Sequence, residues 1–502
     1  MHLNGRKHTI ILTLLAVAAV VSPTVLCEGG TASAGTSSDP TYYDAEVTPF
    51  TFPESKGTPI LTTLSAAEKT VDIAVYYLGS EDIVALLCDL EEKEGVDVRV
   101  IVPKNALGID ITQEVSRLKE LVACGGEVNI INYDGCDEKR YNYFHNKYAV
   151  IDNDTVIITS ENWTESNMSS KGNRGWGAVI QSAGYAEYMT GIFENDFSET
   201  NSDVKNINDA YPDIEKSGDL TYTIPSAYPT VTYTAKVAPV TSPQNSKTAL
   251  TQFIDSATER IYVEQLDVDD TNASLTEDSL IAGMVEKADL GIDVKYILNG
   301  TYETGSDKDT QDHHALIQTL NGSTKIKAAI YEKTKAFPQI HNKGVIVDDK
   351  VWVGSVNWTE SSFNKNRETA VIIDSAEVTD YYLAYFDTDF SNAYSASYTK
   401  TDSLGHTLTF VSEVSATNTS YGVKAHYHCP ECNKDFIGDS EVSAEDMRIE
   451  KTAQEEKGGL MYYLGAVIAA IAVAAAAFMK KSAKKAVRSA SHSGKRSSGK
   501  RR

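Results

Sequence analysis

The chain has 502 residues, of which 41% are hydrophobic and 23% are charged, so it is long enough for two or three domains and is not wholly disordered. Its 70 acidic residues against 46 basic ones give a net charge of −24 at pH 7. This charge repels polyanions at long range and argues against a general nucleic-acid-binding protein.

The first segment, residues 1–35, is predicted to be a signal peptide and leader. Arg6 and Lys7 precede the apolar run IILTLLAVAAVV, and small residues follow at 32–34. A basic start, an apolar run and then small residues are the order typical of a secretory signal. An uncleaved membrane anchor is the alternative for this segment.

Two long, similar units follow at 46–200 and 225–395, separated by a linker at 201–224. They open with ILTTLSAAEKTVDIAVYYL and ALTQFIDSATERIYVEQLDV, patterns that predict an amphipathic helix leading into an apolar strand. Later segments again predict helices alternating with strands, which favours a layered α/β fold. A repeat of about 190 residues is too long for a solenoid, so we interpret the units as a duplicated α/β domain.

Each unit contains nearly the same stretch, FHNKYAVIDNDTVIITSENWTES in the first and IHNKGVIVDDKVWVGSVNWTES in the second. Two apolar segments flank a short polar turn, which predicts a hairpin of buried strands. The recurring polar residues are His145, Lys147, Asp152, Ser160, Asn162, Thr164 and Glu165 in the first copy, and His341, Lys343, Asp348, Ser355, Asn357, Thr359 and Glu360 in the second. Packing alone does not explain this recurrence.

The residue types of this pattern suit a phosphate group. Residues two apart on a strand face the same side, so each copy gathers an imidazole, an ammonium, a hydroxyl and an amide. The ammonium and the hydrogen-bond donors can stabilise charge on phosphate oxygens. A histidine can attack phosphorus or protonate a leaving oxygen, but one histidine cannot do both. Two copies docked across a pseudo-twofold axis would place two imidazoles on opposite sides of one phosphate.

The pattern His-x-Lys-x4-Asp followed by Gly-Ser-x-Asn resembles the HKD signature of the phospholipase D superfamily, and the likeness covers roughly 46–395. The double motif is specific for the superfamily but not for a substrate, because its members include phospholipases, cardiolipin synthases, nucleases and inactive relatives. The resemblance implies two tandem phospholipase D-like α/β/α domains related by pseudo-twofold symmetry. It also implies a reaction that needs no metal cofactor and passes through a phosphohistidine.

The resemblance also implies roles for individual residues. By the family's convention His145 is the nucleophile and His341 the acid and base, and Lys147 and Lys343 complete the catalytic set. The residues implied to bind phosphate or to support the site are Asp152, Asp348, Ser160, Ser355, Asn162, Asn357 and Glu368.

The first copy departs from the family pattern at two positions. Thr159 stands where the second copy has Gly354, and a β-branched residue there can crowd the phosphate pocket. Glu368 stands where family members carry a carboxylate that supports a histidine, but the first copy has Gly175. This difference predicts that one imidazole is less well oriented.

Two further segments carry histidines. The stretch NGTYETGSDKDTQDHH is predicted to be a polar surface loop in which His313 and His314 are solvated. Residues 396–457 are predicted to form a small stalk module. Within it, a structural zinc site is a candidate at Cys429, Cys432, His426 and His428. One Cys-x2-Cys knuckle supplies only two good ligands, so a disulfide or two unpaired thiols remain alternatives.

The C-terminal end predicts a membrane anchor. Residues 460–479 contain no charge and are long enough to span a bilayer as a helix, and the basic tail at 480–502 is expected to be cytoplasmic. The two ends hold 12 of the 46 basic residues and no acidic one, so the outer part has 34 basic and 70 acidic residues, a net charge of −36.

The leading hypothesis is therefore a cell-membrane phosphodiesterase with its catalytic part outside the cytoplasm. It would hydrolyse phospholipid or another phosphodiester, and transfer to another alcohol remains open because both reactions share the phosphohistidine. A nuclease of the same superfamily is less favoured, since it needs a basic cleft that this composition does not indicate. A catalytically inactive surface-binding protein is the third hypothesis.

Overall fold

The computed structural model describes residues 40–104, 110–136, 138–226, 228–275, 279–300, 307–334, 336–397, 399–401, 407–411, 420–424, 426–437 and 440–451. The predicted signal peptide, membrane span and basic tail lie outside these residues. The described residues from Thr41 onward belong to one compact unit. None of the helices within the described ranges is long and apolar enough to cross a membrane.

The first half of this unit contains β1 (Tyr43–Phe52), α1 (Thr58–Leu64), β2 (Thr70–Val75), α2 (Glu81–Asp89) with a π turn (Leu90–Glu94), β3 (Asp97–Pro103), α3 (Thr112–Cys124), β4 (Glu127–Ile131), β5 (Lys147–Ile151), β6 (Thr155–Thr159), β7 (Gly175–Gln181), α4 (Ala183–Phe197), β8 (Val204–Asn206) and α5 (Ile207–Ala210).

The second half contains β9 (Tyr233–Ser242), α6 (Ser246–Asp255), β10 (Arg260–Gln265), α7 (Asp270–Ala273), α8 (Leu280–Asp289), β11 (Asp293–Asn299), α9 (Asp307–Ser323), β12 (Lys327–Tyr331), β13 (Lys343–Val347), β14 (Lys350–Gly354), α10 (Glu360–Asn364), β15 (Glu368–Asp374) and α11 (Ala376–Ser397). Short strands follow: β16 (Thr399–Thr401), β17 (Thr407–Val411), β18 (Gly422–Val423), β19 (His426–Cys429), β20 (Lys434–Ile437), β21 (Ser440–Val442) and β22 (Arg448–Ile449).

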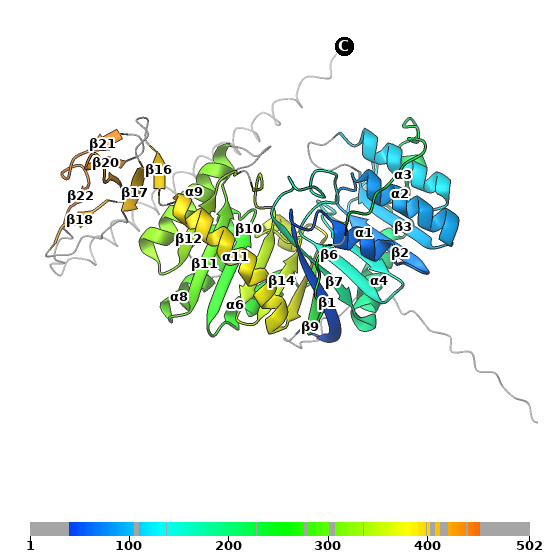
Figure 1. Ribbon diagram of the computed structural model, residues 1–502, viewed down its shortest axis with the longest axis horizontal. Helices are drawn as coiled ribbons and strands as arrows, with labels where there is room; N and C mark the ends of the chain where they lie inside the picture. The colour runs from blue at the N-terminus through cyan, green and yellow to red at the C-terminus, as the bar shows by residue number, and fades with distance from the viewer. Residues whose placement is uncertain are drawn as a thin grey trace, which may run out of the picture. The chain divides into compact units, whose positions relative to one another are not determined.

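The two halves share one sheet. Its strand order is β12-β11-β10-β13-β14-β15-β9-β1-β7-β6-β5-β2-β3-β4-β8, and the halves meet where β1 and β9 pair antiparallel (Figure 1). Outward from this pair, both halves repeat the same order of strands, apart from the additional edge strand β8. The predicted hairpins are confirmed as β5–β6 and β13–β14, and the predicted α/β fold is confirmed with them.

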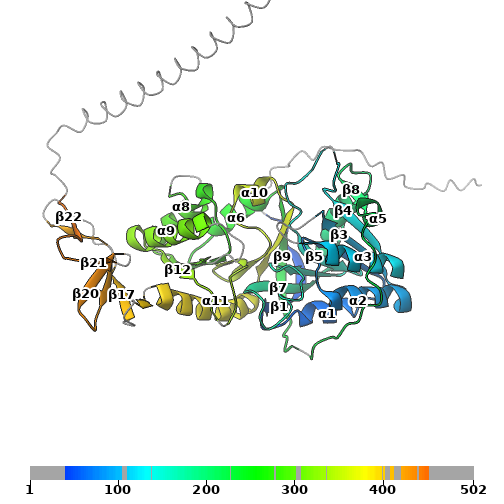
Figure 2. The same ribbon diagram turned by 90° about the horizontal axis from the view of Figure 1, so that it is seen from above.

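Helices cover both faces of the sheet, as Figures 1 and 2 show. In the first half α1, α2 and α3 contribute to one hydrophobic cluster, and in the second half α6, α8 and α9 contribute to another. A third cluster joins α4 and α11 to strands from both halves. In this shared cluster the Tyr382 ring stacks on Trp176 at 4.8 Å between centroids, and the Tyr382 hydroxyl donates to the Gly177 carbonyl at 2.6 Å.

Two buried ion pairs cross between the halves. Arg174 of the first half pairs with Asp389 in α11, and Arg367 of the second half pairs with Asp196 in α4; each Nε–Oδ2 distance is 2.6 Å. All four side chains are at least 95% buried. A buried charge without its partner is strongly destabilising, so these crossed pairs require that the two halves dock together.

The central strands β1 and β9 were not predicted from the sequence, and each carries a proline. Pro49 pairs only with Ala178 of β7, and Pro239 pairs only with Val371 of β15. The β1–β9 pairing ends at Val47, before Pro49 is reached. Both prolines therefore lie outside the β1–β9 ladder, and sequence alone does not reveal that each has a partner strand on one side only.

The predicted polar loop around His313 is wrong. Residues 307–323 form α9, and His313 is buried with Nδ1 2.7 Å from the Asn299 carbonyl oxygen. Only His314 keeps a substantially exposed side chain, 38%, beside Glu332. Within the stretch, residues 307–314 belong to this helix and residues 301–306 lie outside the described residues, so the polar composition of 307–314 misled the loop prediction.

We predict that Asp196→Ala lowers the free energy of unfolding by about 3–5 kcal/mol, because it leaves the Arg367 guanidinium buried without its carboxylate. Urea titration of the purified chain followed by tryptophan fluorescence measures this, since Trp163, Trp176, Trp352 and Trp358 are all buried. Lys325→Ala is the control: its pair with Asp289 is more than 60% exposed on both sides, and its loss is expected to cost less than about 1 kcal/mol. Equal effects of the two substitutions would contradict the role assigned to the crossed pairs.

Candidate active site

Each histidine of the repeated motif is positioned by the other half of the molecule. His145 and His341 lie two residues before β5 and β13. The His145 N–H donates to the Arg367 carbonyl at 2.8 Å, and the His341 N–H donates to the Arg174 carbonyl at 2.9 Å. The arginines of the crossed ion pairs therefore also hold the backbone of the two histidines.

The His145 imidazole faces a buried carboxylate from the second half. Its Nδ1 lies 2.7 Å from Glu368 Oε2. Glu368 also accepts hydrogen bonds from Ser355 Oγ at 2.7 Å and from Asn366 Nδ2 at 2.9 Å. A carboxylate at Nδ1 places the proton on that nitrogen, which leaves the lone pair of Nε2 for chemistry.

The His341 imidazole faces the first half in the corresponding way. Its Nδ1 donates to the Ser160 carbonyl at 3.1 Å and lies 3.2 Å from Glu161 Oε1. Glu161 is fully buried and was not predicted to belong to the site. The signal was present in the sequence, because a glutamate stands between Ser160 and Asn162 where the second copy has Val356.

The lysines of the motif are buried beside the histidines. Lys147 Nζ donates to the His145 carbonyl at 2.9 Å, and Lys343 Nζ donates to the His341 carbonyl. Each ammonium uses one of its three donors in this bond. Asn162 and Asn357 have a buried Oδ1 that forms no hydrogen bond to the described residues. The contacts thus join His145 with Lys147 and, through Glu368, with Ser355, and they join His341 with Lys343 and Ser160. Asn162 and Asn357 follow the two serines by two residues.

The two aspartates of the motif do not lie in the site, which corrects the phosphate-binding role expected for them. Asp152 and Asp348 stand at the other end of β5 and β13, about 17 Å away for five residues at about 3.3 Å each. Asp152 accepts from the N–H groups of residues 68–70, and Asp348 from those of residues 258–260. They support the fold by tying each hairpin turn to the start of β2 or β10.

Thr159 is accommodated within its hairpin. Its Oγ1 donates to the Glu161 carbonyl at 2.9 Å and accepts from Trp163 Nε1 at 3.0 Å. Across the ladder it faces Gly177, which leaves room for the side chain. At the matched position Gly354, a Cβ would lie 2.4 Å from the Cα of Ala370. The expectation that Thr159 crowds the phosphate pocket is therefore wrong.

Burial sets the charge state of the site. Burial lowers the pKa of His145 to about 4 against the opposing effect of Glu368, and the pKa of His341 is lowered by burial and by Lys343. Burial also lowers the pKa of Lys343 to about 8. Burial alone would raise the pKa of Glu368, but neighbouring His145 and Lys147 lower it. Both imidazoles are therefore neutral at pH 7, beside an ionised carboxylate.

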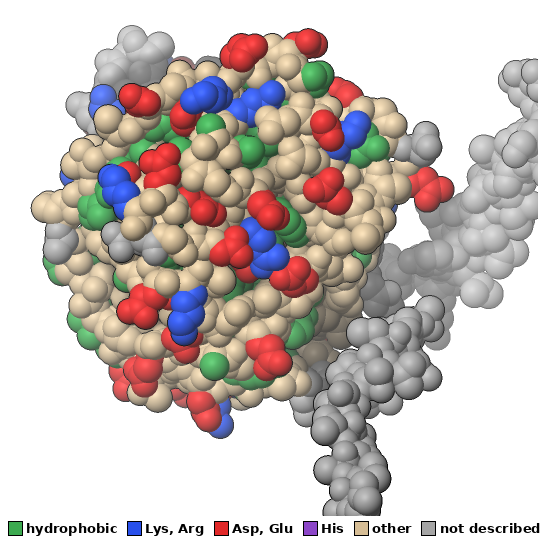
Figure 3. Space-filling model, turned by 90° about the vertical axis from the view of Figure 1, so that its right-hand side faces the viewer, with side chains coloured by type: hydrophobic (Ala, Val, Ile, Leu, Met, Phe, Trp, Pro, Cys, Tyr) green, Lys and Arg blue, Asp and Glu red, His purple; other side chains and the backbone are tan. Residues whose placement is uncertain are grey.

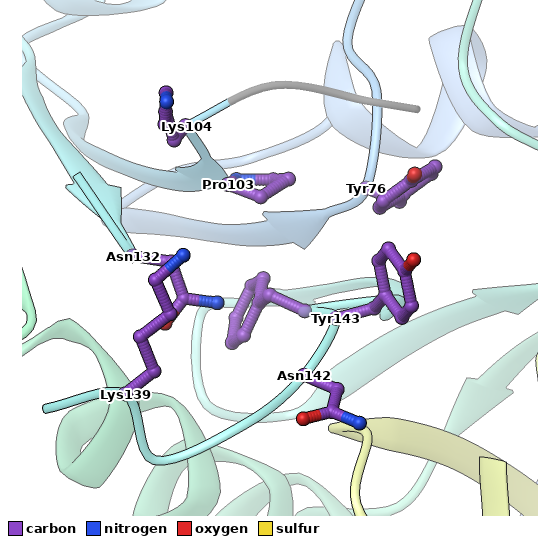
Figure 4. Close-up of a pocket in the computed structure, with 8 residues that line it drawn as sticks. Tyr76, Pro103, Lys104, Asn132, Lys139, Asn142 and Tyr143 are labelled. Atoms are coloured by element: carbon purple, nitrogen blue, oxygen red, sulfur yellow. The ribbon is translucent and has the colours of Figure 1, made fainter. Parts of the chain in front are cut away.

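A pocket of about 370 Å³ adjoins His145 (Figure 4). Tyr76 lines the pocket and also contacts His145 edge-on, with 4.8 Å between the two ring centroids. Figure 4 shows Tyr76 and Tyr143 on one side and Lys104 and Lys139 on the other. The pocket therefore offers aromatic and cationic groups next to an imidazole.

The candidate zinc ligands do not form a metal centre. Within the part of the chain that the structure describes, no group of three or more His, Cys, Asp or Glu side chains is arranged to hold a metal ion. His428 Nδ1 instead lies 2.8 Å from Asp435 Oδ1, and no disulfide joins Cys429 to Cys432. The zinc hypothesis is not supported by this arrangement.

A family model described as cardiolipin synthase, PLD-like domain matches residues 60–197 and 250–390, which together make up more than half of the chain. The chain belongs to this family. The resemblance to the phospholipase D superfamily is thereby confirmed, and the two matched regions correspond to the two halves of the sheet. A search of curated proteins found no match.

Several solved structures resemble this chain at low identity. Phosphatidylserine synthase from Haemophilus influenzae Rd KW20 is 14% identical, with 69% of this chain and 85% of that one covered and a TM-score of 0.49. The phospholipase D family member Nuc from Salmonella typhimurium is 18% identical, with 34% and 98% covered and a TM-score of 0.28. NucT from Helicobacter pylori is 16% identical, with 31% and 96% covered and a TM-score of 0.26.

We predict that His145 remains unprotonated on acidification until about pH 4, and that His341 also titrates below the ordinary value of 6.5, because burial disfavours both imidazolium ions. NMR of ¹⁵N-histidine-labelled protein measures both values, with His145→Ala and His341→Ala assigning the signals. Ordinary values near 6.5 for the two histidines would show that the site is solvated rather than buried.

Proposed function

We propose that this chain is a phosphodiesterase that cleaves phospholipids through a phosphohistidine, with His145 as the nucleophile. The observation that carries the proposal is the pair of largely buried imidazoles, whose side chains are 13% exposed for His145 and 12% exposed for His341. Each has Nδ1 turned toward a carboxylate of the other half, at 2.7 Å for Glu368 and 3.2 Å for Glu161. Each Nε2 is thereby left for a substrate, which is the condition for one group to attack and the other to transfer a proton.

In the first step, His145 Nε2 attacks phosphorus, and a P–N bond forms while the bond from phosphorus to the leaving oxygen breaks. The resting His341 is neutral, but the negative charge of the bound phosphodiester favours its protonation. The imidazolium that results gives its Nε2 proton to that oxygen, so the alcohol leaves neutral. Lys147 and Lys343 supply the positive charge that stabilises the non-bridging oxygens in the transition state. The family resemblance implies that Ser160, Ser355, Asn162 and Asn357 bind the phosphate or support the site.

In the second step, His341 Nε2 takes a proton from water, which attacks phosphorus and breaks the P–N bond. His145 returns to its neutral form, and the phosphomonoester is released. If an alcohol attacks in place of this water, it also gives its proton to His341, and the phosphatidyl group is transferred to the alcohol while the P–N bond breaks. Hydrolysis and transfer therefore use one set of residues.

Three features favour a lipid over a nucleic acid as substrate. The outer part of the chain carries a net charge of −36, and Figure 3 shows acidic and basic side chains interspersed on one face of the first half, without a continuous basic strip there. The pocket beside His145 has room for a polar substituent between tyrosines and lysines. A membrane anchor at 460–479, with residues 46–200 and 225–395 outside the cytoplasm, would hold the site near lipid headgroups.

We predict that the full chain, purified in detergent and assayed in EDTA, releases headgroup alcohol from mixed phospholipid vesicles. His145→Ala and His341→Ala should each reduce this rate by at least about 10³-fold, because each removes one of the two proton-transfer or nucleophilic groups. Cleavage of plasmid DNA lost in the same variants would replace the lipid proposal with a nuclease. Turnover of neither substrate would leave a binding protein.

The two variants should differ on an activated ester. Nitrophenolate leaves without a proton, so with bis(p-nitrophenyl) phosphate His341→Ala should release about one equivalent of nitrophenol in a burst and then stall as the phosphoenzyme. His145→Ala should give no burst. Rapid-quench absorbance measures both, and a burst in His145→Ala instead of His341→Ala would exchange the two roles.

A further inference from the structure

Glu161 and Gly175 of the first half stand where the second half has Val356 and Glu368. The match follows from the backbone, because the Ser160 N–H donates to residue 176 and the Ser355 N–H donates to residue 369, each at 2.9 Å. Each half therefore has one buried carboxylate at the end of its hairpin. In the second half it projects from the start of β15, and in the first half it projects from the residue that follows Ser160.

The two positions compete for one space. A Cβ at Gly175 would lie 2.5 Å from both Cγ and Oε1 of Glu161, and 2.7 Å from Ser160 Oγ. Gly175 does not have a positive φ, so the backbone itself does not require glycine there. The glycine is explained by the space that the Glu161 side chain occupies.

The surroundings of the two carboxylates are also matched. Asn366, two residues before Glu368, donates to its Oε1 at 2.9 Å. Asn173, two residues before Gly175, reaches Glu161 Oε2 at 3.5 Å. The asparagine at this matched position thus contacts a carboxylate in both halves. The carboxylate belongs to the start of β15 in the second half and to the repeated motif in the first half. The first half has kept the location of the carboxylate while changing the residue that carries it.

We propose that Glu161 is the positioning residue for His341 in the reaction proposed above, and that it replaces the carboxylate missing at Gly175. Together with the Ser160 carbonyl, which accepts from Nδ1 at 3.1 Å, the Glu161 carboxylate 3.2 Å away favours the proton of His341 on Nδ1 and so leaves Nε2 for the substrate. It also stabilises the imidazolium that forms when His341 takes the proton of water. On this proposal, the glutamate missing at Gly175 does not leave His341 poorly oriented.

The test exchanges the residues at these two positions of the first half for those found at the matched positions of the second half. Glu161→Val removes the carboxylate, and Gly175→Glu forces two carboxylates into one space, so each alone should lower kcat/KM by about 10²-fold or more. Glu161→Val with Gly175→Glu rebuilds the arrangement of the second half and should recover to within about tenfold of the wild type. A double variant that folds with the wild-type melting temperature yet stays as inactive as Glu161→Val would overturn the proposal.

Glu161→Gln separates positioning from packing, since it keeps the shape of the side chain. With bis(p-nitrophenyl) phosphate it should leave the burst of His145 intact and slow only the second step, which needs His341 as a base. Equal loss of the burst and of turnover would indicate a structural role and contradict the proposal.

A readout independent of activity is the pKa of His341, which Glu161 raises against the effects of burial and Lys343. By NMR it should fall further in Glu161→Val and return in the double variant, while His145 does not change. An unchanged value in Glu161→Val would reject the positioning role. If these shifts occur but the wild type turns over no phosphodiester, the positioning stands and the proposed function fails.

Discussion

The site depends on a crossed contact: the backbone of each histidine is held by an arginine of the other half. The carbonyls of Arg367 and Arg174 accept from His145 and His341, while the guanidinium groups of the same arginines are buried against Asp196 and Asp389. Neither half alone satisfies these four buried charges. The contact that joins the halves is thus the same contact that places the imidazoles, so assembly of the fold and assembly of the site are one event.

The electrostatics of the site follow from that assembly. The side chains of Glu161, Glu368, Lys147 and Lys343 are all buried in the site. The charges of the two carboxylates and the two ammonium groups offset each other before any phosphate binds. Burial then keeps the imidazoles neutral, because a charged ring without water is disfavoured. A phosphodiester adds a negative charge to this set, and the lysines are the groups whose depressed pKa values rise when it binds. A site of this kind is poised for an anion without presenting a basic surface to solvent.

The two halves share geometry more closely than they share residues. At one matched pair of positions, the larger side chain lies on a different strand in each half. In the first half Thr159 lies opposite Gly177, and in the second half Gly354 lies opposite Ala370. Glu161, in the bend after β6, and Glu368, at the start of β15, each lie beside a histidine of the other half. In each case a space of fixed size admits one side chain, and either neighbour can supply it. The duplicated fold therefore constrains where a group must be, rather than which position in the chain must carry it.

The sequence by itself determined the duplication, the helix–strand alternation, the two buried hairpins and the grouping of His, Lys, Ser and Asn, because these depend on local periodicity and on residues a few positions apart. Tertiary structure alone decided the rest. It bound Asp152 and Asp348 to the backbone N–H groups at the start of β2 and β10, brought Glu161 to a histidine 180 residues away, and paired the proline-containing strands β1 and β9 at the centre of the sheet. Each of these depends on a partner distant in the chain, and a local pattern contains no information about which distant strand will lie beside it.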